Sequence, residues 1–271
     1  MSNIKYLIKI GEKAKIASTQ LSRLDNKEKN KVLSDFLRCI KSNRGKILKA
    51  NKVDIDKSKK NKIKENLIDR TMLNEDRINS ICTSIEEVMS FQDPTNKMLS
   101  SWKRPNGLII QRVTMPIGVI AVIYEARPNV TADVSVLCFK SGNAAILRGG
   151  KEAFHTNIVL SNLFRKCLEK NKINPDCVQL INSTNRILVD YILSKMANYV
   201  DVIIPRGGKS LVEKVLNLST VPTIGHLEGL CHIYLDKNFN FNLANKILIN
   251  SKLRRTSICG AAETLLINNQ I

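Results

Sequence analysis

A thiol close to basic residues is the feature of this 271-residue sequence that most directly indicates chemistry. Cys259 follows Arg254 and Arg255 and precedes the strand-like run 263–267. A thiolate is a strong nucleophile, and nearby positive charge favours its formation. We therefore expect a nucleophilic Cys259 at the mouth of a sheet, with the arginines acting on the thiolate, on an anionic leaving group, or on both. Two solvated arginines at the end of a helix are the alternative.

A second candidate group lies in the loop that follows the apolar run 118–124. There Asn129 comes after Arg127 and Pro128, just before a predicted helix. An asparagine amide at such a place can donate a hydrogen bond into a cleft, as an oxyanion hole requires. From this loop alone, a plain helix cap by Asn129 or Thr131 is the favoured interpretation, and an oxyanion role is the alternative.

Two further loops place paired glycines and basic residues between a strand and a helix. Glycines let the backbone approach a phosphate closely, and a helix N-terminus favours an anion. Neither loop has the spacing of a G-x-G-x-x-G fingerprint or of a Walker loop. Their occurrence at equivalent places predicts a nucleotide-type ligand, bound by Arg148, Gly149, Gly150 and Lys151 in one loop and by Pro205, Arg206, Gly207 and Gly208 in the other.

The elements that must position these groups follow from the pattern of apolar residues. Residues 4–89 have a helical period, interrupted by a charged segment at 57–62 that we expect to be a solvated turn. From about residue 108, apolar strands alternate with helices, which predicts parallel β-α-β units with helices on both faces of the sheet. The predicted strands are 118–124, 144–147, 178–181 and 200–204, with a further strand opening at Cys231, and the predicted helices are 131–140, 152–170 and 186–198.

Composition narrows the class of protein. No apolar run is long enough to span a bilayer, and the N-terminus lacks a secretory pattern, so we expect a cytoplasmic protein without a membrane partner. The seven cysteines are scattered and form no C-x-x-C pair, so neither a disulfide framework nor a metal site is expected. The net charge of +19 is spread along the chain, which favours a solvated basic surface over a nucleic-acid groove.

Five segments of the sequence resemble the gamma-glutamyl phosphate reductase (glutamate-5-semialdehyde dehydrogenase) family of the aldehyde dehydrogenase superfamily. The resemblance covers essentially the whole chain, through the segments 115–131, 140–150, 200–208, 225–233 and 254–266. It implies an aldehyde-dehydrogenase-like α/β fold with a parallel Rossmann-type sheet. It also implies an NADP-dependent oxidoreductase of proline biosynthesis, which reduces gamma-glutamyl phosphate to glutamate 5-semialdehyde with NADPH through a cysteine thioester.

The resemblance also assigns roles to residues. Cys259 matches the family nucleophile, Asn129 the oxyanion-hole asparagine, and the two Gly-Gly loops the dinucleotide contacts. Arg127, Arg254 and Arg255 are implied to bind the substrate. The glutamate that acts as general base in hydrolytic relatives corresponds to His226 or to Glu228. A histidine in place of this base would leave the thioester protected from hydrolysis, as the reductase reaction requires.

Only twelve residues follow Cys259, fewer than a catalytic domain of ordinary size requires. We expect three parts: an N-terminal helical region at 1–104, a dinucleotide-binding domain at 105–255, and the start of a truncated catalytic domain at 256–271. The alternatives to a working enzyme are an inactive or split fragment that only binds the nucleotide and, remotely, a basic nucleic-acid-binding protein. The resemblance further implies a homo-oligomer and transient contact with glutamate 5-kinase.

Overall fold

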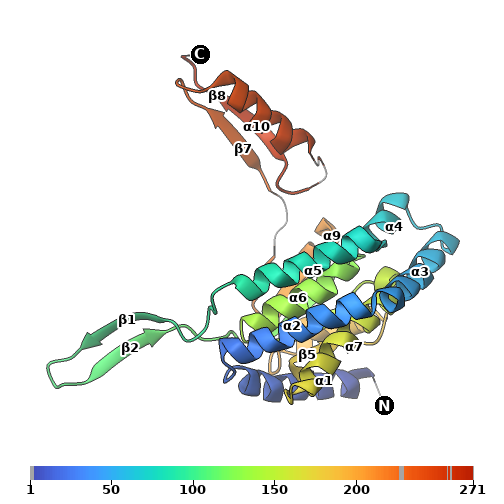
Figure 1. The fold of residues 1–271 in the computed structure, drawn as a ribbon, viewed down its shortest axis with the longest axis vertical. Helices are drawn as coiled ribbons and strands as arrows, with labels where there is room; N and C mark the ends of the chain where they lie inside the picture. The colour runs from blue at the N-terminus through green and yellow to red at the C-terminus, as the bar shows by residue number, and fades with distance from the viewer. Residues whose placement is uncertain (1–2, 226–228, 255, 257, 271) are drawn as a thin grey trace. The chain divides into compact units, whose positions relative to one another are not determined.

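The computed structural model describes residues 3–225, 229–254, 256 and 258–270. Contacts within the chain divide it into two compact units, Met1–Gly225 and His226–Ile271. We call them unit 1 and unit 2 (Figure 1). The division at 104/105 and 255/256 rests on sequence pattern and stays a prediction.

A four-stranded parallel sheet forms the centre of unit 1. Its strands lie in the order β5-β4-β3-β6. All residues of β3 and β4 are buried, as expected for apolar strands covered on both faces. The four strands predicted from the sequence are confirmed, with bounds β3 (Val119–Tyr124), β4 (Ala144–Arg148), β5 (Val178–Leu180) and β6 (Val202–Arg206).

Successive residues of β3 enter two different hydrophobic cores, because side chains alternate across a strand. Ile120, Val122 and Tyr124 pack with the layer that contains α2 (Asn26–Ser42), α5 (Glu75–Ser90), α6 (Pro128–Lys140) and α7 (Phe154–Lys170). Val119, Ala121 and Ile123 pack with α1 (Asn3–Leu21), α8 (Ile187–Lys195) and α9 (Lys209–Leu218). The sheet is therefore covered by helices on both faces, which confirms the predicted α/β architecture.

The charged segment at 57–62 is mostly helical, so the predicted solvated turn is wrong for its first four residues. They belong to α3 (Arg44–Lys60), and α4 (Glu65–Thr71) follows it. Asp54 and Ser58 on α3 are buried. The Asp54 carboxylate accepts hydrogen bonds from the Thr156 backbone N–H and hydroxyl at the start of α7. A buried polar face thus replaces the apolar stripe by which helices are usually recognised.

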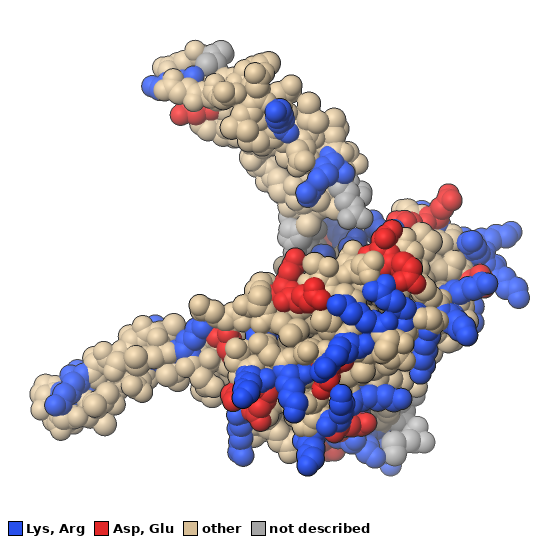
Figure 2. Space-filling view, viewed as in Figure 1, with Lys and Arg blue, Asp and Glu red and all other residues tan. Residues whose placement is uncertain are grey.

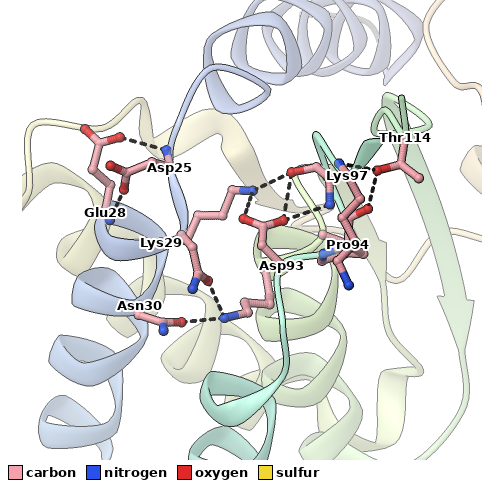
Figure 3. A network of polar contacts seen from close by, with 12 residues as sticks. Asp25, Glu28, Lys29, Asn30, Asp93, Pro94, Lys97 and Thr114 are labelled. Atoms are coloured by element: carbon pink, nitrogen blue, oxygen red, sulfur yellow. Dashed lines mark hydrogen bonds and ion pairs between the residues drawn. The ribbon is translucent and has the colours of Figure 1, made fainter. Parts of the chain in front are cut away.

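A two-stranded antiparallel hairpin, β1 (Met98–Lys103) with β2 (Ile109–Val113), extends from unit 1 (Figure 1). Nearly all of its residues are exposed, including Trp102. The base of the hairpin is held by polar contacts. Figure 3 shows the buried Lys29 ammonium donating to Asp93, while the Thr114 hydroxyl donates to the Pro94 carbonyl, at 2.8 and 2.7 Å.

Unit 2 is built from a parallel strand pair and one helix. The strands are β7 (Cys231–Leu235) and β8 (Ala262–Ile267), joined through α10 (Phe241–Leu253). Both strands were predicted. Among the described residues of unit 2, only Ala244, Ala261 and Ala262 are buried, and large apolar side chains on all three elements are exposed.

No helix within the described residues is long and apolar enough to cross a membrane. On the face of unit 1 seen in Figure 2, Lys and Arg side chains cover the helices and are interspersed with Asp and Glu. Several basic side chains of unit 1 form ion pairs, as in Lys41–Glu86 at 3.0 Å and Arg44–Glu75 at 2.7 Å.

Candidate functional site

The carboxyl ends of the parallel strands of unit 1 meet at one edge of the sheet. Ile123 pairs with Arg148 of β4, and Tyr124 pairs with Arg206 of β6, so the loops after these strands lie side by side. Ligands of open α/β sheets bind at this edge. A cavity of about 420 Å³ opens here, and its lining includes Glu125, Arg148, Lys151, Thr184, Arg186 and Lys214.

Arg148 is the most deeply buried cation of this cavity, with 9% of its surface exposed. Its guanidinium donates to the Gly149 carbonyl at 2.7 Å and to the Thr184 carbonyl at 3.1 Å. Its Nε is buried and has no hydrogen-bond partner among the described residues. Burial, with a smaller contribution from Arg186, lowers the pKa of Arg148, although Glu152 opposes the shift. A buried guanidinium that donates to these carbonyls and whose Nε has no partner among the described residues favours an anionic ligand.

The glycines of the two loops differ in what surrounds them. A side chain at Gly149 would collide with the Asn157 amide and the Tyr124 ring, and one at Gly207 would meet the Glu125 carboxylate. The contacts at Gly149 are with two interior side chains, whereas Gly207 is exposed and the Glu125 carboxylate beside it is the end of a flexible side chain. At Gly208, the nearest atom to an added Cβ would be a Glu125 oxygen 3.8 Å away, so there is space beside this residue.

Glu125 is a residue of the site that the sequence reasoning did not single out. Its carboxylate accepts a hydrogen bond of 2.9 Å from the Gly208 N–H at the start of α9, and its own N–H donates to the Arg206 carbonyl. A carboxylate is a natural partner for a helix N-terminus. The position of Glu125 directly after an apolar strand was the feature of the sequence that could have identified it as a site residue. A phosphate at this N-terminus would have to replace the Glu125 carboxylate.

Asn129 is the second residue of α6, and Arg127 is the cap residue of that helix. The Asn129 amide donates to the Asp133 carboxylate at 3.0 Å, and Arg127 has no side-chain cap hydrogen bond. Burial raises the pKa of Asp133, and the hydrogen bond from Asn129 opposes this. Thr131 is buried and hydrogen-bonded to Tyr124 and Asn157. The predicted cap by Asn129 or Thr131 is therefore wrong, and the oxyanion role stays a prediction.

Cys259 lies in a turn of unit 2 just before β8, and its side chain is exposed. The Cys231 thiol donates to the Cys259 carbonyl at 3.3 Å. That carbonyl also lies against Gly229, where any side chain would collide with it. The backbone of Cys259 is thus held by contacts with Cys231 and Gly229. Its side chain remains accessible to a reactant.

The structure brings together the predicted residues of unit 1 at the sheet edge. Arg148 and Lys151 line the cavity with Gly150, and Pro205 and Arg206 end the neighbouring strand, followed by Gly207 and Gly208. In unit 2, Arg254 is an exposed residue at the C-terminus of α10. The predicted roles of Arg255, His226 and Glu228 lie outside the described residues.

The sheet, its helical layers and the cavity at its carboxyl edge define an aldehyde-dehydrogenase-like α/β protein. An acetylating aldehyde dehydrogenase from Geobacillus thermoglucosidasius shares this fold at 16% identity, with a TM-score of 0.67 over 99% of the chain and 56% of that structure. The gamma-glutamyl phosphate reductase of Thermotoga maritima is more similar, with 36% identity and a TM-score of 0.92 over 98% of the chain and 64% of that structure.

Curated relatives agree with the structural comparison. The gamma-glutamyl phosphate reductases of Brucella suis and Clostridium tetani are each 43% identical to the chain over 267 residues. Over nearly its whole length, the chain is therefore similar to gamma-glutamyl phosphate reductases. These alignments include 98% of the chain but 63% and 62% of the relatives, so the chain spans somewhat less than two thirds of their length. No protein-family model matches the chain.

Proposed function

We propose that this chain takes part in the NADPH-dependent reduction of gamma-glutamyl phosphate to glutamate 5-semialdehyde and phosphate, the second step of proline biosynthesis. The observation that carries the proposal is the 43% identity to gamma-glutamyl phosphate reductases over 98% of the chain. Such a reaction needs a nucleophile and positive charge that can bind phosphate groups. The exposed thiol of Cys259 can supply the first, and the cations that line the cavity of unit 1 the second.

The residues of unit 1 fit a dinucleotide. The buried and incompletely bonded Arg148 and the exposed Lys151 offer positive charge to phosphate groups. The Gly208 N–H would become a further donor to a phosphate that replaced the Glu125 carboxylate. When bound, NADPH supplies a hydride to the acyl carbon. The protein's part is to hold the cofactor phosphates and to exclude water from the reacting carbon.

Cys259 acts as the nucleophile in this proposal. Its thiolate attacks the acyl carbon, a carbon–sulfur bond forms, and the carbon–oxygen bond to phosphate breaks, leaving a thioester. After hydride addition the carbon–sulfur bond breaks, the aldehyde leaves, and the thiolate is restored. The Asn129 amide is proposed to stabilise the oxyanion, and Arg127, Arg254 and Arg255 to bind the substrate phosphate and carboxylate.

The proposal is tested in the reverse direction, by phosphate-dependent reduction of NADP with glutamate 5-semialdehyde. We expect absorbance at 340 nm to rise with the unmodified chain and not with Cys259→Ala. Activity that survives in Cys259→Ala would reject the thioester route. NADPH binding by calorimetry is measured on the same samples, so a loss of folding is distinguished from a loss of chemistry.

Nucleotide binding without turnover is the second candidate function. It is favoured by the fact that the cavity and its cations belong to unit 1 alone, whose sheet is covered on both faces. Saturable NADPH binding with no reverse reaction would support it. We further propose a cytoplasmic location, a homo-oligomer and transient contact with glutamate 5-kinase, which would protect the labile acyl phosphate.

A further inference from the structure

Two cysteines that the proposed reaction does not use lie in contact within unit 1. Cys39 on α2 and Cys167 on α7 are 128 positions apart in the sequence, yet their sulfur atoms are 3.3 Å apart. A disulfide bond is about 2.05 Å long, so an approach of little more than an ångström would join them. Both sulfurs are free thiols in the structure.

The packing around the pair keeps the two helix turns together. Phe36 and Phe164, each three residues before one of the cysteines, meet edge to face with ring centroids 4.8 Å apart. Asp35 accepts hydrogen bonds from Lys170 at 3.0 Å and from Asn171 at 2.8 Å, which ties α2 to the C-terminal end of α7. An aromatic contact and two polar contacts therefore hold the thiols in reach of one another.

The two thiols differ in access to solvent. Cys39 is half-buried, whereas Cys167 is 1% exposed. Burial, followed by the contact with Cys39, raises the pKa of the Cys167 thiol. A small oxidant therefore reaches Cys39 first, and Cys167 is placed to react with the product. This is the arrangement of an exposed attacking thiol beside a resolving one.

We propose that Cys39 and Cys167 form a reversible intramolecular disulfide when the protein meets a peroxide. The Cys39 thiolate attacks one peroxide oxygen, the oxygen–oxygen bond breaks, and Cys39 becomes a sulfenic acid while the hydroxide released takes up the thiol proton as water. Cys167 then attacks the Cys39 sulfur and a second water leaves. In sum, two thiols and one hydrogen peroxide give one disulfide and two waters, and a dithiol reductant reverses the change.

Peptide mapping of the full chain tests this proposal. The protein is treated with hydrogen peroxide, its remaining thiols are blocked with N-ethylmaleimide, and the monomer band of a non-reducing gel is digested with trypsin. Cleavage places the cysteines in separate peptides, 39–41 and 167–170. We expect these peptides linked, lighter than their sum by two hydrogens, and separated by dithiothreitol. We also expect the oxidised protein to melt roughly 5 °C or more above the reduced one, since the bond closes a long loop.

The controls separate this bond from general oxidation. In Cys39→Ser, checked for native circular dichroism, the linked peptide and the rise in melting temperature should both disappear. In Cys82→Ser, which alters another buried cysteine of the same core, both should remain. Oxidation of the exposed Cys259 shows that the peroxide has reacted with the protein. If peptides 39–41 and 167–170 are still unlinked at that point, the proposal is overturned. A link that is found only in dimers would overturn it as well. Neither result bears on the proposed reductase function, which Cys259 tests.

Discussion

Units 1 and 2 both contain parallel strands, but the two sheets are buried to very different extents. In unit 1, every residue of β3 is buried between two helical layers. In unit 2, exposed residues alternate with half-buried ones along β7, and most of β8 is exposed. The surface of α10 carries Phe241, Leu243 and Ile247, exposed by 72, 58 and 49%. Parallel strands ordinarily have both faces covered, so unit 2 departs from the rule that unit 1 follows.

The contrast extends to polar groups. Within the described residues, all buried polar or charged side chains belong to unit 1, among them Lys29, Arg148 and Asp54. Unit 1 therefore has a fixed interior in which hydrogen bonds position charges, as a ligand site requires. Unit 2 offers the exposed thiol of Cys259. Under the proposed function, binding depends on unit 1 and covalent chemistry on unit 2.

The largest expected effect tests that division of roles. Cys259→Ala should reduce the proposed reverse reaction by at least about a thousandfold, because the proposed nucleophile is lost. NADPH affinity should stay within about twofold, since the cations of the cavity are untouched. Rates at 340 nm and calorimetry measure the two quantities on one sample. A parallel loss of NADPH affinity would contradict the separation of binding from chemistry.

Core substitutions in the two units sharpen the comparison in terms of stability. Phe164 is fully buried and contacts both Phe36 and Phe139. Phe164→Ala should lower the free energy of unfolding by about 3–5 kcal/mol. Leu265→Ala, at a position that is 44% exposed, should change it by less than about 1 kcal/mol. Urea unfolding followed by circular dichroism provides both values, and similar losses would show that β8 is more deeply packed than the structure indicates.

Buried charge gives unit 1 a dependence of stability on pH. Burial alone would raise the pKa of Asp93, but hydrogen bonds from Lys29 and Thr95 outweigh it and lower the pKa. A carboxyl whose folded pKa is depressed stabilises the protein above its unfolded pKa, about 4, and this contribution is lost as pH falls through the folded pKa. Asp93→Asn should cost about 1–3 kcal/mol at pH 7 and much less at pH 2. Equal costs at both values would show that the charge contributes nothing.

The sequence was sufficient to predict the strands of unit 1 in which every residue is buried. The apolar runs at 118–124 and 144–147 predicted β3 and β4 because both faces of each strand are covered. The hairpin β1–β2 was missed, since its residues are exposed on both faces and show no apolar alternation. The end of α3 was missed because its buried face carries the polar residues Asp54 and Ser58. The partner of Asp54 is Thr156 on α7, about 100 residues away in the sequence.

The candidate site was predictable as a place and less so in its contacts. Short loops after parallel strands located it at the carboxyl edge of the sheet, where the structure has a cavity. The partner of Asn129 was not foreseen, because Asp133 becomes relevant only once α6 begins at Pro128 and the two side chains share a face. Gly149 was assigned to phosphate binding, whereas the Asn157 amide and the Tyr124 ring lie against it, which only the fold reveals.

The smallest expected effects are those of substitutions at Gly149 and Gly208. They should distinguish a glycine that is needed for packing from one that is needed for ligand binding. Gly149→Ala would displace Asn157, which accepts a hydrogen bond from Thr131 at 2.8 Å. We expect a loss of about 1–3 kcal/mol in the free energy of unfolding. Gly208→Ala meets only a Glu125 oxygen at 3.8 Å and should cost less than about 1 kcal/mol. If a phosphate approaches this backbone, Gly208→Ala should still weaken NADPH binding severalfold, and unchanged affinity would place the phosphates elsewhere along the edge.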